Sequence, residues 1–214
     1  MKKNKWFLFS LVLFFIPLAL NLIFYSQLPD TIAVHFDING NPDGFMSKPW
    51  ALFGILAFLV GMHVLCCVST LNDPKKNNIP DFILRIILMI CPVTAIIITG
   101  IIVSYSLGYP MNTNVWVGGI LGFLFILLGN YLPKVQKNYT VGIKTPWSLD
   151  LEENWNRSNR LGGYCLVVSG FIFIFGAFFH QIMWGIIFVI ASSILVLVYS
   201  FYLQMNYHNK CNSL

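Results

Sequence analysis

The sequence has little charge. Only 10% of its 214 residues are Asp, Glu, Lys or Arg, whereas 57% are hydrophobic and 16% are aromatic. Soluble domains average about 25% charged residues. Because so little of the chain suits water, we exclude a soluble globular domain and predict a protein of several membrane spans. We read the net charge of +5 as basic residues beside membrane helices, which contact the lipid bilayer, and predict no direct nucleic-acid binding.

The sequence also lacks the motifs of metal sites and common hydrolases. None of its five cysteines has zinc-site spacing with nearby histidines,. The stretch Asp37-x-Asn39-x-Asn41 begins like a calcium loop, but Pro42 and Lys48 stand where Gly and Glu are required,. G-x-S-x-G and H-E-x-x-H are both missing,. We therefore predict no metal, no cofactor and no enzymatic activity.

Apolar residues gather in six segments. About 20 such residues cross the hydrocarbon core of a bilayer. The segments are residues 6–25, 49–70, 82–107, 115–132, 164–179 and 183–205. We predict an all-α membrane protein of six transmembrane helices, located in the cell membrane as a multi-pass protein. Pro17, inside the first segment, predicts a local kink,.

The distribution of Lys and Arg predicts the orientation of these helices. With the N-terminus in the cytoplasm, twelve of the thirteen basic residues lie on the inside and only Lys48 lies outside. This asymmetry follows the positive-inside rule. We therefore predict that both termini are cytoplasmic.

Three regions follow from this topology. Residues 1–70 hold the first two helices and an extracellular loop at 27–48. In this loop the alternating stretch 31–36 predicts a strand, and the turn residues after it predict a hairpin or compact cap,. Residues 71–128 hold the third helix and most of the fourth. Residues 129–214 hold the last two helices and a long polar segment. The inner loop at 71–81 reads as a plain connector, and we assign it no function.

The polar segment Gly129–Gly163 is the longest interruption of the apolar pattern. It contains five of the thirteen basic residues and three of the eight acids. Thr145 precedes a proline and should be extended. Asp150 followed by Glu153 has the form of a capping box, so we predict a helix that starts at Leu151 and continues into the fifth span.

Two sets of residues in the sequence recur in a known family at similar spacing. The polar segment supplies Asn130, Pro133, Asn138, Gly142, Lys144, Thr145, Pro146, Trp147, Trp155, Asn159 and Arg160. The outer loop supplies Pro29, His35, Phe36, Gly40, Asp43 and Lys48. The first set resembles the signature of the bacterial SdpI family, and the second resembles the DUF1648-type domain that commonly precedes it. Lys144 stands where the family usually has Arg, and Asn159 where many members have His.

The resemblance implies a function. The member that gives the family its name protects a toxin-producing bacterium from its own secreted peptide toxin. With toxin present, it also holds a transcriptional repressor, of the ArsR type, at the membrane. By this resemblance, the outer-loop residues are candidates for binding a peptide toxin outside the cell. The polar-segment residues are candidates for binding a cytoplasmic partner.

Other interpretations stay open at this stage. Trp147 and Trp155 could anchor an amphipathic connector on the inner leaflet. Gly118-x-x-x-Gly122 permits close helix packing, either within the chain or in a dimer. The alternative function is a small-molecule or ion transporter or channel of the bacterial membrane, with a polar path lined by residues such as Asn21 and His63. Few charges lie inside the spans, which argues against an ion-coupled pump.

Overall fold

The computed structural model of the protein describes residues 2–37, 39–109, 112–179 and 181–212. Within these residues, six helices are long and apolar enough to span a membrane. They are Lys5–Gln27, Trp50–Leu71, Asp81–Ser106, Asn114–Lys134, Glu152–Phe178 and Ile182–Asn209. The predicted architecture of a six-helix, multi-pass membrane protein is therefore confirmed.

The first span is interrupted near its middle. Helix α1 (Lys2–Val12) ends before Leu13, and α2 (Phe15–Phe24) continues the span into the short helix η1 (Tyr25–Gln27). Pro17 has no N–H to bond the carbonyl of Leu13, which lies four residues before it. The helix is therefore interrupted one turn before the proline, close to the predicted kink.

The chain divides into two compact units. The first comprises Met1–Leu71 and Asp81–Thr113, and the second comprises Asn72–Pro80 and Asn114–Leu214. After η1, the first unit contains β1 (Thr31–Phe36), β2 (Pro42–Ser47), the π-helix η2 (Trp50–Gly54), α3 (Ile55–Leu71) and α4 (Asp81–Ser106). The second contains η3 (Lys76–Asn78), α5 (Thr113–Tyr131), η4 (Leu132–Lys134), α6 (Pro146–Asp150), α7 (Glu152–Phe178) and α8 (Ile182–Asn212).

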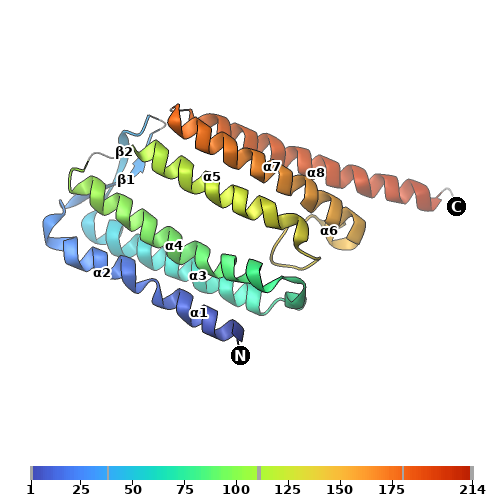
Figure 1. Ribbon diagram of the computed structural model, residues 1–214, viewed down its shortest axis with the longest axis horizontal. Coiled ribbons are helices and arrows are strands. Elements are labelled where there is room, and N and C mark those ends of the chain that lie inside the picture. Colours follow the sequence, from blue (N-terminus) through green and yellow to red (C-terminus); the bar gives the residue numbers. More distant parts are fainter. Residues whose placement is uncertain (1, 38, 110–111, 180, 213–214) are drawn as a thin grey trace. The chain divides into compact units, whose positions relative to one another are not determined.

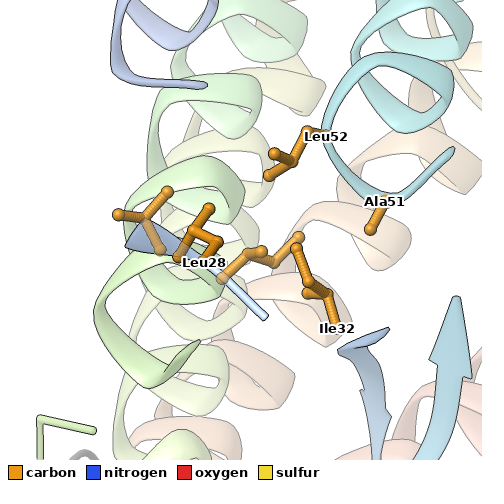
Figure 2. Packing of buried hydrophobic residues seen from close by; sticks show 6 residues of the cluster. Leu28, Ile32, Ala51 and Leu52 are labelled. Atoms are coloured by element: carbon orange, nitrogen blue, oxygen red, sulfur yellow. The ribbon is translucent and has the colours of Figure 1, made fainter. Parts of the chain in front are cut away.

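The outer loop folds as the predicted hairpin. β1 pairs antiparallel with β2, and the register shifts around His35. Ile32 of β1 is fully buried and packs with Leu28, Ala51 and Leu52, as Figure 2 shows. One face of the hairpin thus covers the ends of helices in the first unit, which explains why a two-stranded sheet is ordered at all.

The second unit is built on close approaches between helices. α7 and α8 run side by side (Figure 1). Glycines of α5 lie against α7: a Cβ on Gly118 would come within 2.5 Å of the Ala177 Cβ, and one on Gly122 within 2.6 Å of the Gly170 carbonyl. These glycines therefore serve packing within the chain, one of the two roles that their spacing allowed.

Candidate functional site

The two glycines that bound the polar segment meet in space. A Cβ on Gly129 would lie 2.6 Å from the Gly163 carbonyl oxygen, and one on Gly163 would lie 2.7 Å from the Gly129 carbonyl oxygen. Pro133 packs on the same spot, with its Cδ 2.8 Å from a Gly163 Cβ. Any larger side chain at either glycine would push α5 and α7 apart. The segment between them is consequently a closed loop with a fixed base.

Trp155 is the centre of this loop. Its side chain is 0% exposed, and its Nε1 donates a hydrogen bond to the Val135 carbonyl at 2.8 Å. The six-membered part of the ring lies against Gly142, where a Cβ would come within 2.6 Å of the ring. Gly142 has φ 132°, a conformation that side chains rarely adopt,. A glycine is thus needed at position 142 of this chain for two reasons, the backbone conformation and the space.

Two asparagines replace regular secondary structure in the loop. Asn138 is fully buried; its Oδ1 accepts from the N–H groups of Thr140 and Val141, and its Nδ2 donates to the carbonyls of Gln136 and Val141. Buried backbone groups need such partners. Asn159 does the same from α7: its Oδ1 accepts from the Ile143 N–H at 2.9 Å, and its Nδ2 donates to the Trp155 carbonyl.

Thr145 begins the short helix α6. It is extended, as predicted, and forms a capping box with Ser148 in which each side chain accepts from the other residue's N–H. The capping box predicted at Asp150 and Glu153 is wrong. Asp150 ends α6, and Leu151 is the N-cap of α7 without a side-chain hydrogen bond. The start of α7 at Glu152 agrees with the predicted position to one residue.

A buried polar network joins α6 and α7 to α8. The Ser200 hydroxyl donates to Asn154 Oδ1 at 2.8 Å, so the Thr145 hydroxyl, 3.0 Å away, is left to donate to Ser200. Ser158 also donates to Asn154 Oδ1, and Asn154 Nδ2 donates to the Ser200 carbonyl. All four side chains are nearly inaccessible. A satisfied buried network of this kind fixes one arrangement of its helices.

The inner loop at 72–80 belongs to the same site, and the sequence interpretation missed it. Asp73 is 4% exposed and accepts from the Tyr139 N–H at 2.9 Å, from the Thr140 hydroxyl and from the Lys75 N–H. Asn78 Nδ2 donates to the Lys137 carbonyl at 2.6 Å. No spacing rule connects this loop to residues that lie more than fifty positions further along the chain.

The hydrogen bonds to Asp73 lower the pKa of its carboxyl by more than burial raises it. Burial alone would raise the pKa of this carboxyl, but the bonds from the Thr140 hydroxyl and the N–H groups of Lys75 and Tyr139 hold the pKa below its ordinary value,. Asp73 is therefore ionised at neutral pH. Because its bonds are charge-assisted, they are stronger than bonds between neutral groups.

The structure separates the signature residues into two sets. Asn138, Thr145, Trp155 and Asn159 are buried, and Gly142 and Trp147 are half-buried. The exposed positions are Asn130, Pro133, Lys144, Pro146 and Arg160. The first set shapes the loop, whereas the second faces outward. In this conformation, the exposed cations Lys144 and Arg160 are more available to a partner than the buried residues.

Lys144 is an exposed cation held against the loop backbone. Its Nζ donates to the carbonyls of Tyr139 at 3.1 Å and Thr140 at 3.0 Å. Arg157 pairs with Glu153, which lies four residues before it on α7, at 2.7 Å,. The surface of the loop thus carries the cation of Lys144 at a fixed position, beside an Arg157–Glu153 ion pair.

The outer-loop candidates lie at two ends of the hairpin. His35 Nδ1 and Asp43 Oδ1 are 2.5 Å apart at the tip, and both side chains are exposed. Lys48 lies at the base, where its Nζ is 3.2 Å from Asp30 Oδ1 and over the Tyr25 ring.

The remaining outer-loop candidates shape the turn and its packing. Phe36 packs edge-on against Tyr105 of α4. Gly40 has φ 86° in the turn, beside Asp37, whose pKa is lowered by the hydrogen bond from the Asn41 N–H above all. Pro29 is exposed just before β1. Among the described residues, no group of three or more His, Cys, Asp or Glu side chains could hold a metal ion.

Comparison with known proteins places this loop in a family. The profile of the SdpI/YfhL protein family matches residues 134–201, and the profile of a domain of unknown function, DUF1648, matches residues 12–60. Residues 134–201 are thus similar to the SdpI/YfhL protein family. The matched region begins at the loop and ends just after Ser200, so it contains the whole network around Trp155 and Asn154.

Two relatives extend the comparison. The chain is 29% identical to "Immunity protein SdpI" of Bacillus subtilis over 216 residues, which cover 99% of each chain. It is 34% identical over 62 residues to an uncharacterized protein of Archaeoglobus fulgidus, covering 29% of this chain and 34% of that one. No solved structure matches.

Proposed function

We propose that this protein is an integral membrane immunity protein that gives resistance to a secreted peptide toxin. The observation that carries the proposal is the similarity to an immunity protein over 99% of both chains. A likeness of this extent includes the hairpin, all six spans and the buried loop. It therefore concerns the whole architecture and not one shared domain.

The hairpin of the first unit is the proposed place of contact with toxin. Its tip presents the exposed pair of His35 and Asp43, and β2 presents Phe45 and Met46, which are 58% and 45% exposed. The distribution of Lys and Arg in the sequence predicts that this hairpin lies outside the cell. Exposed apolar side chains beside paired charges are what an amphipathic peptide would bind.

We further propose that the loop around Trp155 receives a cytoplasmic repressor of the ArsR type. Its buried residues would act only by holding the surface in shape, and Lys144 and Arg160 would make the contact. Both are exposed cations, so the proposed partner surface is acidic.

A growth assay tests immunity. Expression of the chain in a toxin-sensitive strain should raise the toxin concentration that stops growth. The paired variant Phe45→Ser/Met46→Ser should lose this protection, and Trp50→Ser, at an exposed aromatic residue outside the strand, should keep it. Equal killing with and without the wild-type chain, for each candidate peptide, would refute the proposal.

A recruitment assay tests the inner surface separately. A fluorescent repressor should move to the membrane when wild-type protein and toxin are both present. Lys144→Ala/Arg160→Ala should abolish this movement while the amount of folded protein in the membrane stays unchanged. Arg157→Ala is the matched control, because Arg157 lies on the same helix but is paired with Glu153. Normal recruitment by the double variant would remove Lys144 and Arg160 from the proposal.

A further inference from the structure

An apolar recess opens on the second unit between α7 and α8. Its volume is about 290 Å³. The residues that line it include Leu132, Ile143, Cys165, Leu166, Val189 and Val196. We call it the inner recess. This volume is near the lower limit of the roughly 300–1,000 Å³ of small-molecule pockets, so it suits one slender apolar group.

The inner recess lies at the depth of the hydrocarbon core. At 1.5 Å per residue, its lining on both helices lies about 10–24 Å from the turn that joins α7 to α8. Phe178, Phe179 and Trp184 are exposed at that turn, and exposed aromatic residues mark a membrane interface,. Since the core is about 30 Å thick, the inner recess faces lipid chains from near the middle of the core into its cytoplasmic half.

The polar atoms in the wall do not call for water. The hydroxyls of Ser192 and Ser193 both donate to the Val189 carbonyl, at 3.1 Å and 2.7 Å. A buried water needs two to four polar partners. Without water, the apolar lining lacks packing contacts on one side. A hydrocarbon chain would supply those contacts best.

Two lysines follow closely in the chain after residues that line the recess. Ile143 closes it from the loop and is followed by Lys144; Leu132 lines it and is followed two residues later by Lys134. Both lysines are exposed. Gly162 makes this arrangement possible, because a Cβ there would overlap the Ile143 side chain. An anionic headgroup fits this charge, and an acyl chain fits the space above it.

We propose that the inner recess binds one acyl chain of an anionic phospholipid, whose headgroup lies at Lys134 and Lys144. The lipid would thus contact Ile143, a residue of the loop that Asn159 holds in place. The acyl-chain part of this site is separate from both surfaces of the proposed immunity function, whereas its headgroup end shares Lys144 with the proposed partner surface.

Native mass spectrometry of the full chain tests the proposal. After extraction from vesicles of phosphatidylglycerol and phosphatidylcholine, wild-type protein should retain one phosphatidylglycerol. Ser193→Phe fills the recess and should lower the retained fraction about tenfold, the effect of losing one good contact. Ile194→Phe adds the same ring at a 57% exposed position of α8 that does not line the recess, and should change nothing.

Further variants keep the test decisive if Ser193→Phe does not fold. Ser193→Leu fills less space and should lower retention in the same direction. Lys134→Gln should reduce the preference for phosphatidylglycerol over phosphatidylcholine about fivefold, since a surface lysine contributes about 1 kcal/mol toward anionic lipid. Wild-type protein without retained lipid, retention unaffected by filling, or a lipid-free dimer that the filling variant disrupts would each overturn the proposal.

Discussion

Trp147 and Trp155 offer a matched pair of substitutions for testing how the loop is held. Both belong to the family signature, and both can be changed to Phe. Trp155 is 0% exposed and donates to the Val135 carbonyl. Trp147 is half-buried, packs edge-on against Phe201 at 5.5 Å, and its Nε1 has no hydrogen-bond partner among the described residues.

The two substitutions should lower the free energy of unfolding by different amounts. Trp155→Phe leaves the Val135 carbonyl buried without its partner, which costs about 1–3 kcal/mol. The smaller ring also leaves space beside Gly142, so we expect a total of about 2–4 kcal/mol. Trp147→Phe removes no hydrogen bond and keeps the aromatic contact, so its cost should stay below about 1 kcal/mol.

Thermal unfolding in lipid nanodiscs measures the difference. At roughly 2–4 °C per kcal/mol for a chain of this size, Trp155→Phe should lower Tm by about 5–15 °C, and Trp147→Phe by about 4 °C or less. The thiol of Cys165 lies on α7 in the same unit. Its reaction with a maleimide dye on heating reports the unfolding of that unit. Equal shifts for the two variants would show that the Trp155 hydrogen bond does not hold the loop.

Three further predictions concern the same unit. Asp73→Asn should destabilise the loop by about 1.5–3 kcal/mol, because its bonds are charge-assisted. In the wild type, the contribution of the Asp73 carboxylate to the stability of the loop should be complete above its ordinary pKa of 3.8 and lost as pH falls through the lowered pKa,. This loss should appear as faster hydrogen exchange of the loop at low pH, and Asp73→Asn should not show that pH dependence. Gly142→Ala should lower Tm through the positive φ, at a cost of about 1–3 kcal/mol, whereas Gly119→Ala in α5, where a Cβ meets nothing within 4 Å, should not,. Thr145→Val removes the cap and the bond to Ser200; a loss of about 1–2 kcal/mol should appear as faster proteolysis after α6, and an unchanged rate would contradict the network,.

Local features of this chain were predictable because each has a signal within a few residues. A run of about 20 apolar residues is enough to define a span. The alternation at 31–36 and the turn residues after it defined the hairpin. Thr145 before Pro146 defined an extended residue, although the capping box was assigned to Asp150 when it forms at Thr145. Thr145-x-x-Ser148 has Ser where the usual capping box has Glu or Gln, so no sequence signal marked it,.

The sequence alone therefore determined the six spans, the hairpin and the resemblance to a known family. It also identified the residues of the loop, because family spacing is a property of the chain. The tertiary structure decided what those residues do. Asp73 reaches Thr140 across 67 positions, and Thr145 reaches Ser200 across 55. Contacts between side chains so far apart leave no periodic pattern, so only the folded loop reveals that Trp155, Asn138 and Asn159 build its interior and that Lys144 and Arg160 form its surface.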